Sequence, residues 1–109
     1  MQKSTPVVAR ILSAISRIQD GAGDISLPGL IIFLHICEHD GIGIKELIFL
    51  SGFSESLVSR AVDRLARIRK GEMGLVHVVR HLDDRRRRFI HLTEKGVALR
   101  EELAAILSL

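Results

Sequence analysis

Residues 54–70 read SESLVSRAVDRLARIRK and predict a single amphipathic helix. Ser54 is a good residue to cap its first turn, because a seryl hydroxyl can accept a hydrogen bond from an unpaired backbone N–H. Lys70 and Gly71 supply a basic last turn and a residue that tolerates the left-handed conformation of a helix stop. The apolar side of this helix consists of Val58, Ala61, Val62, Leu65 and Ile68.

The opposite side of the helix is polar, with small hydroxyls near its start and arginines after them. Serine and arginine can hydrogen-bond base edges and phosphates, so this face suits a helix that enters the major groove of DNA. A solvated face on an ordinary core helix is the plainer interpretation, and the helix alone favours it. Asp63 is expected to orient Arg60 or Arg67 through an i−3 or i+4 pairing. The candidates for DNA contact in this segment are Ser54, Ser56, Ser59, Arg60, Arg64 and Arg67.

The composition is that of one small globular domain of 109 residues, with 47% hydrophobic and 27% charged residues. No apolar run approaches the roughly 20 residues that span a bilayer. The N-terminal sequence MQKSTPVVAR lacks the apolar segment and cleavage site of an export signal. Cys37 is the only cysteine, which excludes an internal disulfide and fits a reducing compartment. We therefore expect a cytoplasmic protein that does not bind membranes.

Positive charge is concentrated in one part of the chain, although the net charge is only +3. Residues 60–91 contain ten Lys or Arg against four acidic residues, a net of +6, and the remaining residues carry a net of −3. This concentration favours a polyanionic partner. A membrane surface is the competing polyanion, but Phe89 is the only aromatic residue in the basic part, and interfacial helices depend on such anchors.

Three helices are expected before the one at residue 54. The first begins at residues 4–6 (STP), with proline in its first turn, and residues 21–24 (GAGD) end it. The second, residues 27–38, is apolar nearly all round, which predicts the buried centre of the protein. The third, residues 44–50, is joined to the fourth by residues 51–53 (SGF). Two helices joined by so short a glycine-containing turn predict a helix-turn-helix.

A β-hairpin is expected after the fourth helix, because residues 74–81 and 87–92 are rich in β-branched residues on either side of a polar tip at residues 82–86. Thr93 then caps a last helix over residues 94–108. The fold class that follows is mainly α with a small β-hairpin wing (α+β). It is a winged helix-turn-helix in the order α-α-α-α-β-β-α, with residues 1–109 forming one domain and about 42–93 its DNA-reading part.

Four consecutive arginines stand at the end of the predicted hairpin, residues 85–88. A solvated charge run is the plainer interpretation, but four like charges repel each other, and contact with phosphates relieves that repulsion. Arg88 lies on the same side of its strand as Ile90 and Leu92, so it is also expected along the edge of the core. The candidates for DNA contact on the wing are Arg80, Arg85, Arg86 and Arg87.

Five short blocks stand in order along the chain, at residues 45–47 (KEL), 54–65 (SESLVSRAVDRL), 74–76 (GLV), 84–86 (DRR) and 92–96 (LTEKG). In sequence and spacing they resemble the MarR-type winged helix-turn-helix regulators. The resemblance implies a homodimeric transcription regulator, most often a repressor, that binds pseudo-palindromic double-stranded DNA. It also implies that Asp84 braces the wing through Arg86 so that an arginine reaches the minor groove. In many members a small molecule or cysteine oxidation controls binding, and the sequence does not specify an effector for this chain.

The same resemblance implies that the first and last helices of two subunits interleave, here at about residues 4–20 and 94–109. Both helices carry an apolar stripe at helical spacing, which agrees with this role. The candidates for the dimer interface are Val8, Ile11, Leu12, Ile15, Leu99, Leu103, Ile106 and Leu107.

The chain departs from the family pattern in three places. The segment of residues 66–73 is longer than the corresponding segment in the family, so the fourth helix or its exit loop is expected to be longer. The wing between Arg80 and Asp84 is short, which limits its reach. The C-terminal dimerisation region is also short, so a smaller interface and a reduced or absent ligand cavity are expected.

Other kinds of site find little support in the sequence. His35 and His39 share one helical face but supply only two ligands, so no metal and no cofactor is expected. Cys37 lies within an apolar helix, where a thiol is usually buried and inert. The histidines of the hairpin (His77, His81 and His91) are expected to be exposed, with no switching role. The sequence shows no nucleophile–base arrangement, phosphate loop or carboxylate pair, so we expect no enzymatic activity.

Two other functions compete with duplex binding. A winged-helix protein–protein adaptor would use the same basic face against an acidic partner. A single-stranded nucleic-acid binder would need aromatic stacking platforms, and the chain has no Trp, no Tyr and only four Phe.

Overall fold

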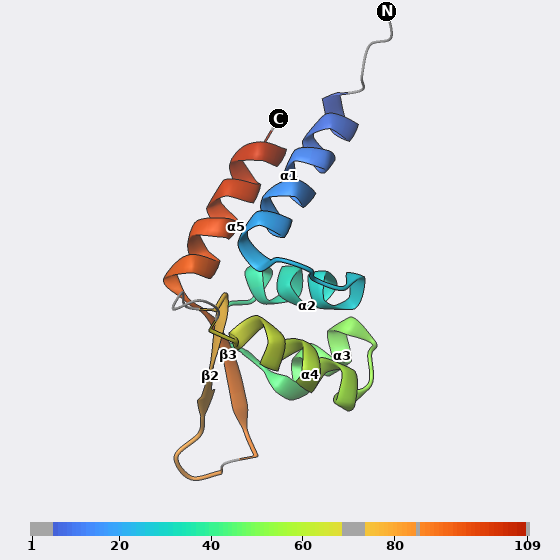
Figure 1. Cartoon of the computed structure of the whole chain (residues 1–109). Helices are drawn as coiled ribbons and strands as arrows, with labels where there is room; N and C mark the ends of the chain where they lie inside the picture. The colour runs from blue at the N-terminus through green and yellow to red at the C-terminus, as the bar shows by residue number, and fades with distance from the viewer. Residues whose placement is uncertain (1–5, 69–73, 85, 109) are drawn as a thin grey trace, which may run out of the picture.

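The computed structural model describes residues 6–68, 74–84 and 86–108 of the chain. Over these residues the fold is mainly α with a small antiparallel sheet and a hairpin wing, as predicted (Figure 1). The predicted helix start at residues 4–5, the helix stop at residues 70–71 and the wing residue Arg85 lie outside the described residues. In chain order the elements are α1 (Pro6–Ala22), α2 (Leu27–Glu38), β1 (Ile42–Gly43), α3 (Ile44–Ser51), α4 (Glu55–Ala66), β2 (Val76–Arg80), β3 (Arg88–Leu92) and α5 (Glu94–Leu107).

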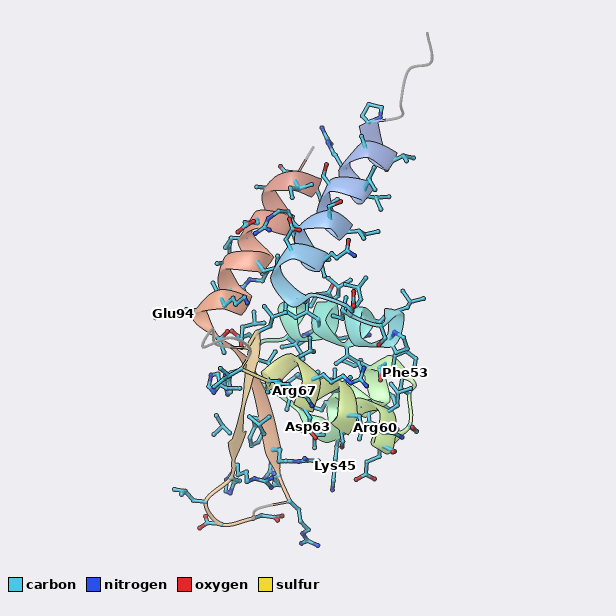
Figure 2. The ribbon with its side chains drawn as sticks, viewed as in Figure 1. Lys45, Phe53, Arg60, Asp63, Arg67 and Glu94 are labelled. Atoms are coloured by element: carbon cyan, nitrogen blue, oxygen red, sulfur yellow. The ribbon has the colours of Figure 1, made fainter. Side chains whose placement is uncertain are left out.

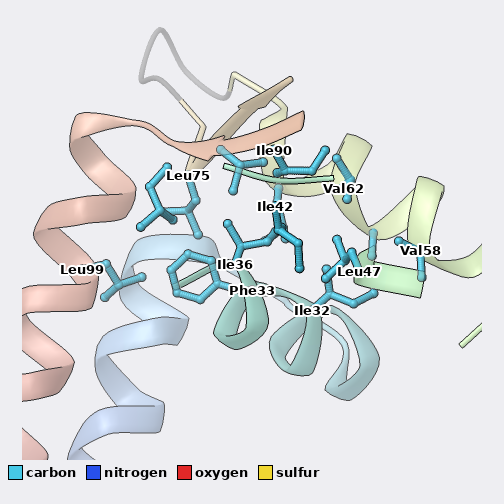
Figure 3. Close-up of a cluster of buried hydrophobic side chains, with 14 of the residues drawn as sticks. Ile32, Phe33, Ile36, Ile42, Leu47, Val58, Val62, Leu75, Ile90 and Leu99 are labelled. Carbon is cyan, nitrogen blue, oxygen red and sulfur yellow. The ribbon is translucent and has the colours of Figure 1, made fainter. Parts of the chain in front are cut away.

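The core forms around one side of α2, whose Ile32, Phe33 and Ile36 are completely buried. Figure 3 shows these three side chains between Leu99 of α5 and Val58 of α4. Ser26 caps α2 as its sequence suggests, because its Oγ accepts a hydrogen bond of 3.1 Å from the Gly29 N–H. The apolar character of α2 therefore predicted the centre of the protein correctly.

The sheet has a third strand, β1, that the sequence pattern did not predict. In the order β1-β3-β2, the predicted hairpin of β2 and β3 is extended by β1, whose Ile42 pairs with Ile90. The Gly41 N–H donates to the Ile90 carbonyl at 2.8 Å, and Gly41 adopts a positive φ of 91°. A strand of two residues is too short to show the alternation by which strands are recognised.

The fourth helix is shorter than predicted, because α4 ends at Ala66 and Arg67 is extended (φ −65°, ψ 130°). The Leu65 carbonyl, which a longer helix would use for its own i+4 N–H, instead accepts a bond of 2.8 Å from the Leu75 N–H. Ile68 is consequently 68% exposed and does not belong to the buried stripe, which corrects its assignment above.

A tightly packed junction connects α4, the hairpin and α5. The Leu75 N–H donates to Leu65, while its carbonyl accepts from the Thr93 N–H at 3.0 Å. The Thr93 hydroxyl donates to the Gly74 carbonyl at 2.6 Å. Glycine is needed at two of these positions: a Cβ on Gly74 would stand 2.6 Å from Ala66 backbone atoms, and one on Gly96 only 2.1 Å from the Leu75 oxygen.

Helices α1 and α5 run side by side in opposite directions and extend away from the other elements (Figure 1). We call this pair the stalk, and α2, α3, α4 and the sheet the lobe. Arg17 of α1 pairs with Glu102 of α5 across the stalk. Within the described residues no single helix is long and apolar enough to cross a membrane, although α1 and α2, bent by 95°, pass that test together.

The two apolar stripes of the stalk differ in their surroundings. Leu99 and Leu103 of α5 were predicted to face a second subunit, and within the single chain they are already covered, at 3% and 6% exposed. A side chain covered by its own chain has little surface left to bury elsewhere. Ile106 is partly buried against the same core, and Leu107 is exposed. The α1 candidates are all exposed: Val8, Ile11, Leu12 and Ile15.

Candidate nucleic-acid interface

Helices α3 and α4 are set by a tight turn at Ser51, Gly52 and Phe53. Gly52 ends α3 in the left-handed conformation (φ 73°), with its N–H donating to the Ile48 carbonyl at 3.0 Å. The Ser51 hydroxyl accepts a bond of 3.2 Å from the Phe53 N–H. The Ser54 Oγ then accepts from the Leu57 N–H at 3.2 Å and caps α4 as predicted. Local hydrogen bonds thus fix how α4 leaves α3.

The polar side of α4 faces solvent along its whole length, while its apolar side is buried in the core. Arg60 donates to the Ser56 hydroxyl at 2.9 Å. In the described part of the chain Asp63 forms no ion pair with Arg60 or Arg67, so the predicted orienting pair is not made and a serine takes its place. Figure 2 shows Arg60 and Asp63 on α4 and Arg67 just beyond its end. The predicted contact residues are exposed at Ser54, Ser56, Arg60, Arg64 and Arg67, and half-buried at Ser59.

A groove of about 650 Å³ runs between the start of α3, the start of α4 and the wing. Its charged lining is mainly basic, with Glu55 and Asp84 as the acidic members. Two basic residues of this lining, Lys45 and Arg88, were not among the predicted contacts. Arg88 was expected at the core edge and is indeed half-buried. Lys45 stands in the first turn of α3, close to the turn that precedes it, and only the fold brings it opposite the wing (Figure 2). The predicted wing arginines that line the groove are Arg80, Arg86 and Arg87.

The wing is ordered by bonds across its tip. Asp84 Oδ1 accepts from the backbone N–H of Arg86 at 3.0 Å and from its Nε at 3.3 Å. These bonds, the backbone one foremost, hold the pKa of Asp84 below its usual range. The guanidinium of Arg87 lies 5.7 Å from the centre of the Phe89 ring, within reach of a cation–π contact. Arg86 and Arg87 are therefore presented from a hydrogen-bonded backbone.

Arg64 and Arg67 border a different hollow. It measures about 60 Å³ and lies where α1 meets α2, with Asp24, Ser26 and Lys95 also in its lining. The two arginines are thus separated from the groove beside the wing, because successive turns of α4 carry them toward the junction with the stalk. The sequence placed Arg60, Arg64 and Arg67 on one face. In the structure Arg64 and Arg67 border this hollow, and none of the three is in the lining of the groove beside the wing.

Within the described residues no group of three or more His, Cys, Asp or Glu is placed to hold a metal ion. His77 and His91 stack across the hairpin with ring centres 5.5 Å apart, and His91 Nδ1 lies 3.7 Å from Asp40. Burial raises the pKa of the half-buried Cys37 thiol to about 11, so it stays protonated near neutral pH.

Several solved structures share this arrangement over nearly the whole chain. The MepR–DNA complex of S. aureus is 21% identical, covers 91% of this chain and 81% of its own, and gives a TM-score of 0.68. A MarR transcriptional regulator of Methanosarcina mazei is 23% identical, with coverages of 94% and 74% and a TM-score of 0.64. The fold is that of the MarR-type regulators.

A third structure with the MarR-type fold is Bordetella bronchiseptica BpsR, whose DNA binding is regulated by 6-hydroxynicotinic acid. It is 19% identical, covers 91% of this chain and 73% of its own, and gives a TM-score of 0.62. No protein-family model and no curated protein matches the sequence. At these identities the likeness establishes the fold alone, and in MarR-type terms α3 and α4 are the helix-turn-helix and β2 and β3 the wing.

Proposed function

We propose that this chain is a MarR-type transcription regulator that binds double-stranded DNA sequence-specifically. It acts in the cytoplasm as a homodimer on a pseudo-palindromic operator, most simply as a repressor. One observation carries the proposal: the first turn of α4, a helix whose polar side is exposed, borders a groove lined by arginines of the wing. A surface with hydrogen-bonding side chains on a helix and cations beside it matches a major groove flanked by phosphates.

The chemistry of α4 supports base recognition in this proposal. Arg60 carries a planar guanidinium that can bind guanine with two hydrogen bonds, and Ser56 already holds it in place. Lys45, Arg80, Arg86 and Arg87 supply phosphate contacts from the groove. Asp63 is an exposed acidic residue of α4 beside Arg60 and Arg64, and carboxylates accept hydrogen bonds from the amino group of cytosine.

The exposed stripe of α1 supports the homodimer. Five large apolar residues on this helix are each about half exposed or more in the single chain, and burying them against a second copy would stabilise a pair of small domains. A dimer carries two α4 helices and so reads two half-sites. The five residues are Val7, Val8, Ile11, Leu12 and Ile15.

Selection from a pool of random duplexes tests the proposal. The wild-type protein should enrich sequences with two inverted half-sites about 10 base pairs apart, or a multiple of that distance. Affinity for the selected duplex should fall steeply with salt, because each neutralised phosphate releases about 0.9 counterions. The matched control is the Arg60→Ala, Arg64→Ala double variant, which should enrich nothing. Failure of the wild type to enrich any duplex, or binding that does not depend on salt, would overturn the proposal and favour the adaptor.

A further inference from the structure

Leu82 stands at the tip of the wing and is 97% exposed, the highest value among the large hydrophobic residues that the structure describes. A single exposed leucine is common on protein surfaces and by itself needs no explanation. Leu82 differs in its position, because the hairpin tip extends beyond the helices of the lobe (Figure 1). From Val76 to Arg80 the strand covers about 13 Å. The apolar side chain is thus held at the end of an arm.

The backbone on both sides of Leu82 is fixed by hydrogen bonds. The His81 N–H donates to the Arg87 carbonyl at 2.9 Å, and the Asp83 N–H donates to His81 Nδ1 at 3.2 Å. The Arg87 N–H in turn donates to the Asp84 carbonyl at 2.9 Å. A side chain on an ordered turn loses less conformational entropy on binding than one on a loose loop. The segment that carries Leu82 would therefore lose little conformational entropy on binding.

The charges around Leu82 indicate the kind of surface it meets. Asp84 pairs with Arg86, and Asp83 is a second acidic residue of the tip, with no ion pair among the described residues. Against it stand the arginines of the groove, so the described wing is basic overall. A protein partner that docks on apolar surface needs a patch of several hundred Å², and one leucine among charges does not form one. Proteins that read the minor groove of DNA often place a single apolar wedge there, between basic side chains that hold the phosphates.

We propose that Leu82 is a specificity-determining residue that enters the minor groove beside each half-site and packs against the sugar walls and base edges. This inference rests on the proposed duplex binding and extends it. The short wing then recognises the width and floor of the minor groove by shape, while its arginines contact the phosphates by charge. Leu82 favours sites whose minor-groove floor is free of the guanine amino group.

The test uses the duplex that the wild-type protein selects from the random pool. We expect Leu82→Ala to raise its Kd roughly tenfold, the scale of losing most of a buried leucine side chain. The slope of log Kd against log salt should stay unchanged, because no charge is removed. Leu82→Met should bind nearly as well as the wild type, and Leu82→Gln, of similar length, should bind like Leu82→Ala. The matched control is Leu27→Ala, since Leu27 is 69% exposed on α2, away from the wing.

A second measurement identifies the groove. Diaminopurine in place of adenine adds an amino group to the minor-groove floor and leaves the major-groove edge unchanged. Under the wing this replacement should weaken binding of the wild type several-fold, and weaken Leu82→Ala clearly less. Equal penalties for both proteins, or wild-type affinity in Leu82→Ala, would overturn this inference and leave duplex binding standing. If the wild type selects no duplex, this inference fails together with the proposed function.

Discussion

Helices α1 and α4 have the same kind of amphipathic sequence and opposite surroundings. In α4 the apolar side is buried in the lobe, at Val58, Val62 and Leu65, and the polar side faces solvent. In α1 only Ala14 and Ile18 are buried, and the larger apolar side chains face solvent. The α4 face is therefore complete within one chain, whereas the α1 face leaves apolar surface in water. Under the proposed function, the two surfaces take different kinds of partner, a polar and anionic one at α4 and an apolar one at α1.

The largest expected effect comes from breaking the α1 surface. Leu12→Glu combined with Ile15→Glu should abolish dimer formation, because each charge would be buried without a partner. Affinity for the selected duplex should fall more than about 100-fold, since the two half-site contacts no longer act together. Analytical ultracentrifugation and a binding titration measure the two outcomes. The control is Ser13→Glu, on another side of the same helix. An unchanged sedimentation coefficient with unchanged DNA affinity would contradict the contrast between α1 and α4.

The next effect concerns the junction that joins these two surfaces. Gly96→Ala should lower the free energy of unfolding by about 2–3 kcal/mol, because its Cβ would stand 2.1 Å from the Leu75 oxygen. Urea denaturation measures the loss. The control is Gly21→Ala within α1, whose Cβ would meet only the Leu99 side chain at 3.4 Å and should stabilise the helix by up to about 1 kcal/mol. Equal stabilities for the two variants would show that the junction can relax.

A smaller change is expected on the α4 surface. Arg60→Ala should weaken binding to the selected duplex by about 1–3 kcal/mol and relax sequence preference at one base pair, while the stability of the fold remains unchanged. The control is Arg10→Ala on α1, which removes the same charge far from the lobe. If both variants lose the same affinity, the role of Arg60 is one of general charge and the α4 face does not read bases.

The smallest effect is expected at the wing. Asp84→Asn should raise the Kd by about two- to fivefold, because the exposed pair with Arg86 is weakened while the turn remains. The folded pKa of Asp84 lies below its ordinary value of 3.8, so its contribution is complete above that value and is lost as the pH falls through the lowered one. The contribution of Asp84 to binding should therefore stay constant between about pH 5 and 8, which lies above its titration. A pH-dependent difference between the variant and the wild type in that range would contradict this assignment.

The parts of the fold that could be predicted from the sequence depend on local signals. The spacing of Val58, Val62 and Leu65 predicted which side of α4 is buried, and the caps Ser54 and Thr93 marked the starts of two helices correctly. These features need only a few neighbouring residues.

The parts that could not be predicted depend on distant residues. The end of α4 at Ala66 is set by Leu75, which arrives from beyond the following loop and takes the Leu65 carbonyl. An apolar stripe shows that a face is covered and not what covers it, so Leu99 was assigned to a second subunit while its own chain buries it. Lys45 joined the candidate groove only because β3 folds back beside α3.

The junction at Gly74 and Leu75 links the end of α4 to the start of α5. One peptide segment is bonded both to the end of α4 and to Thr93 at the start of α5, with no room for even a methyl group at Gly96. A tilt of α5 would therefore act on α4 through this segment. In the proposed dimer, the angle between the two stalks would then set the distance between the paired α4 helices.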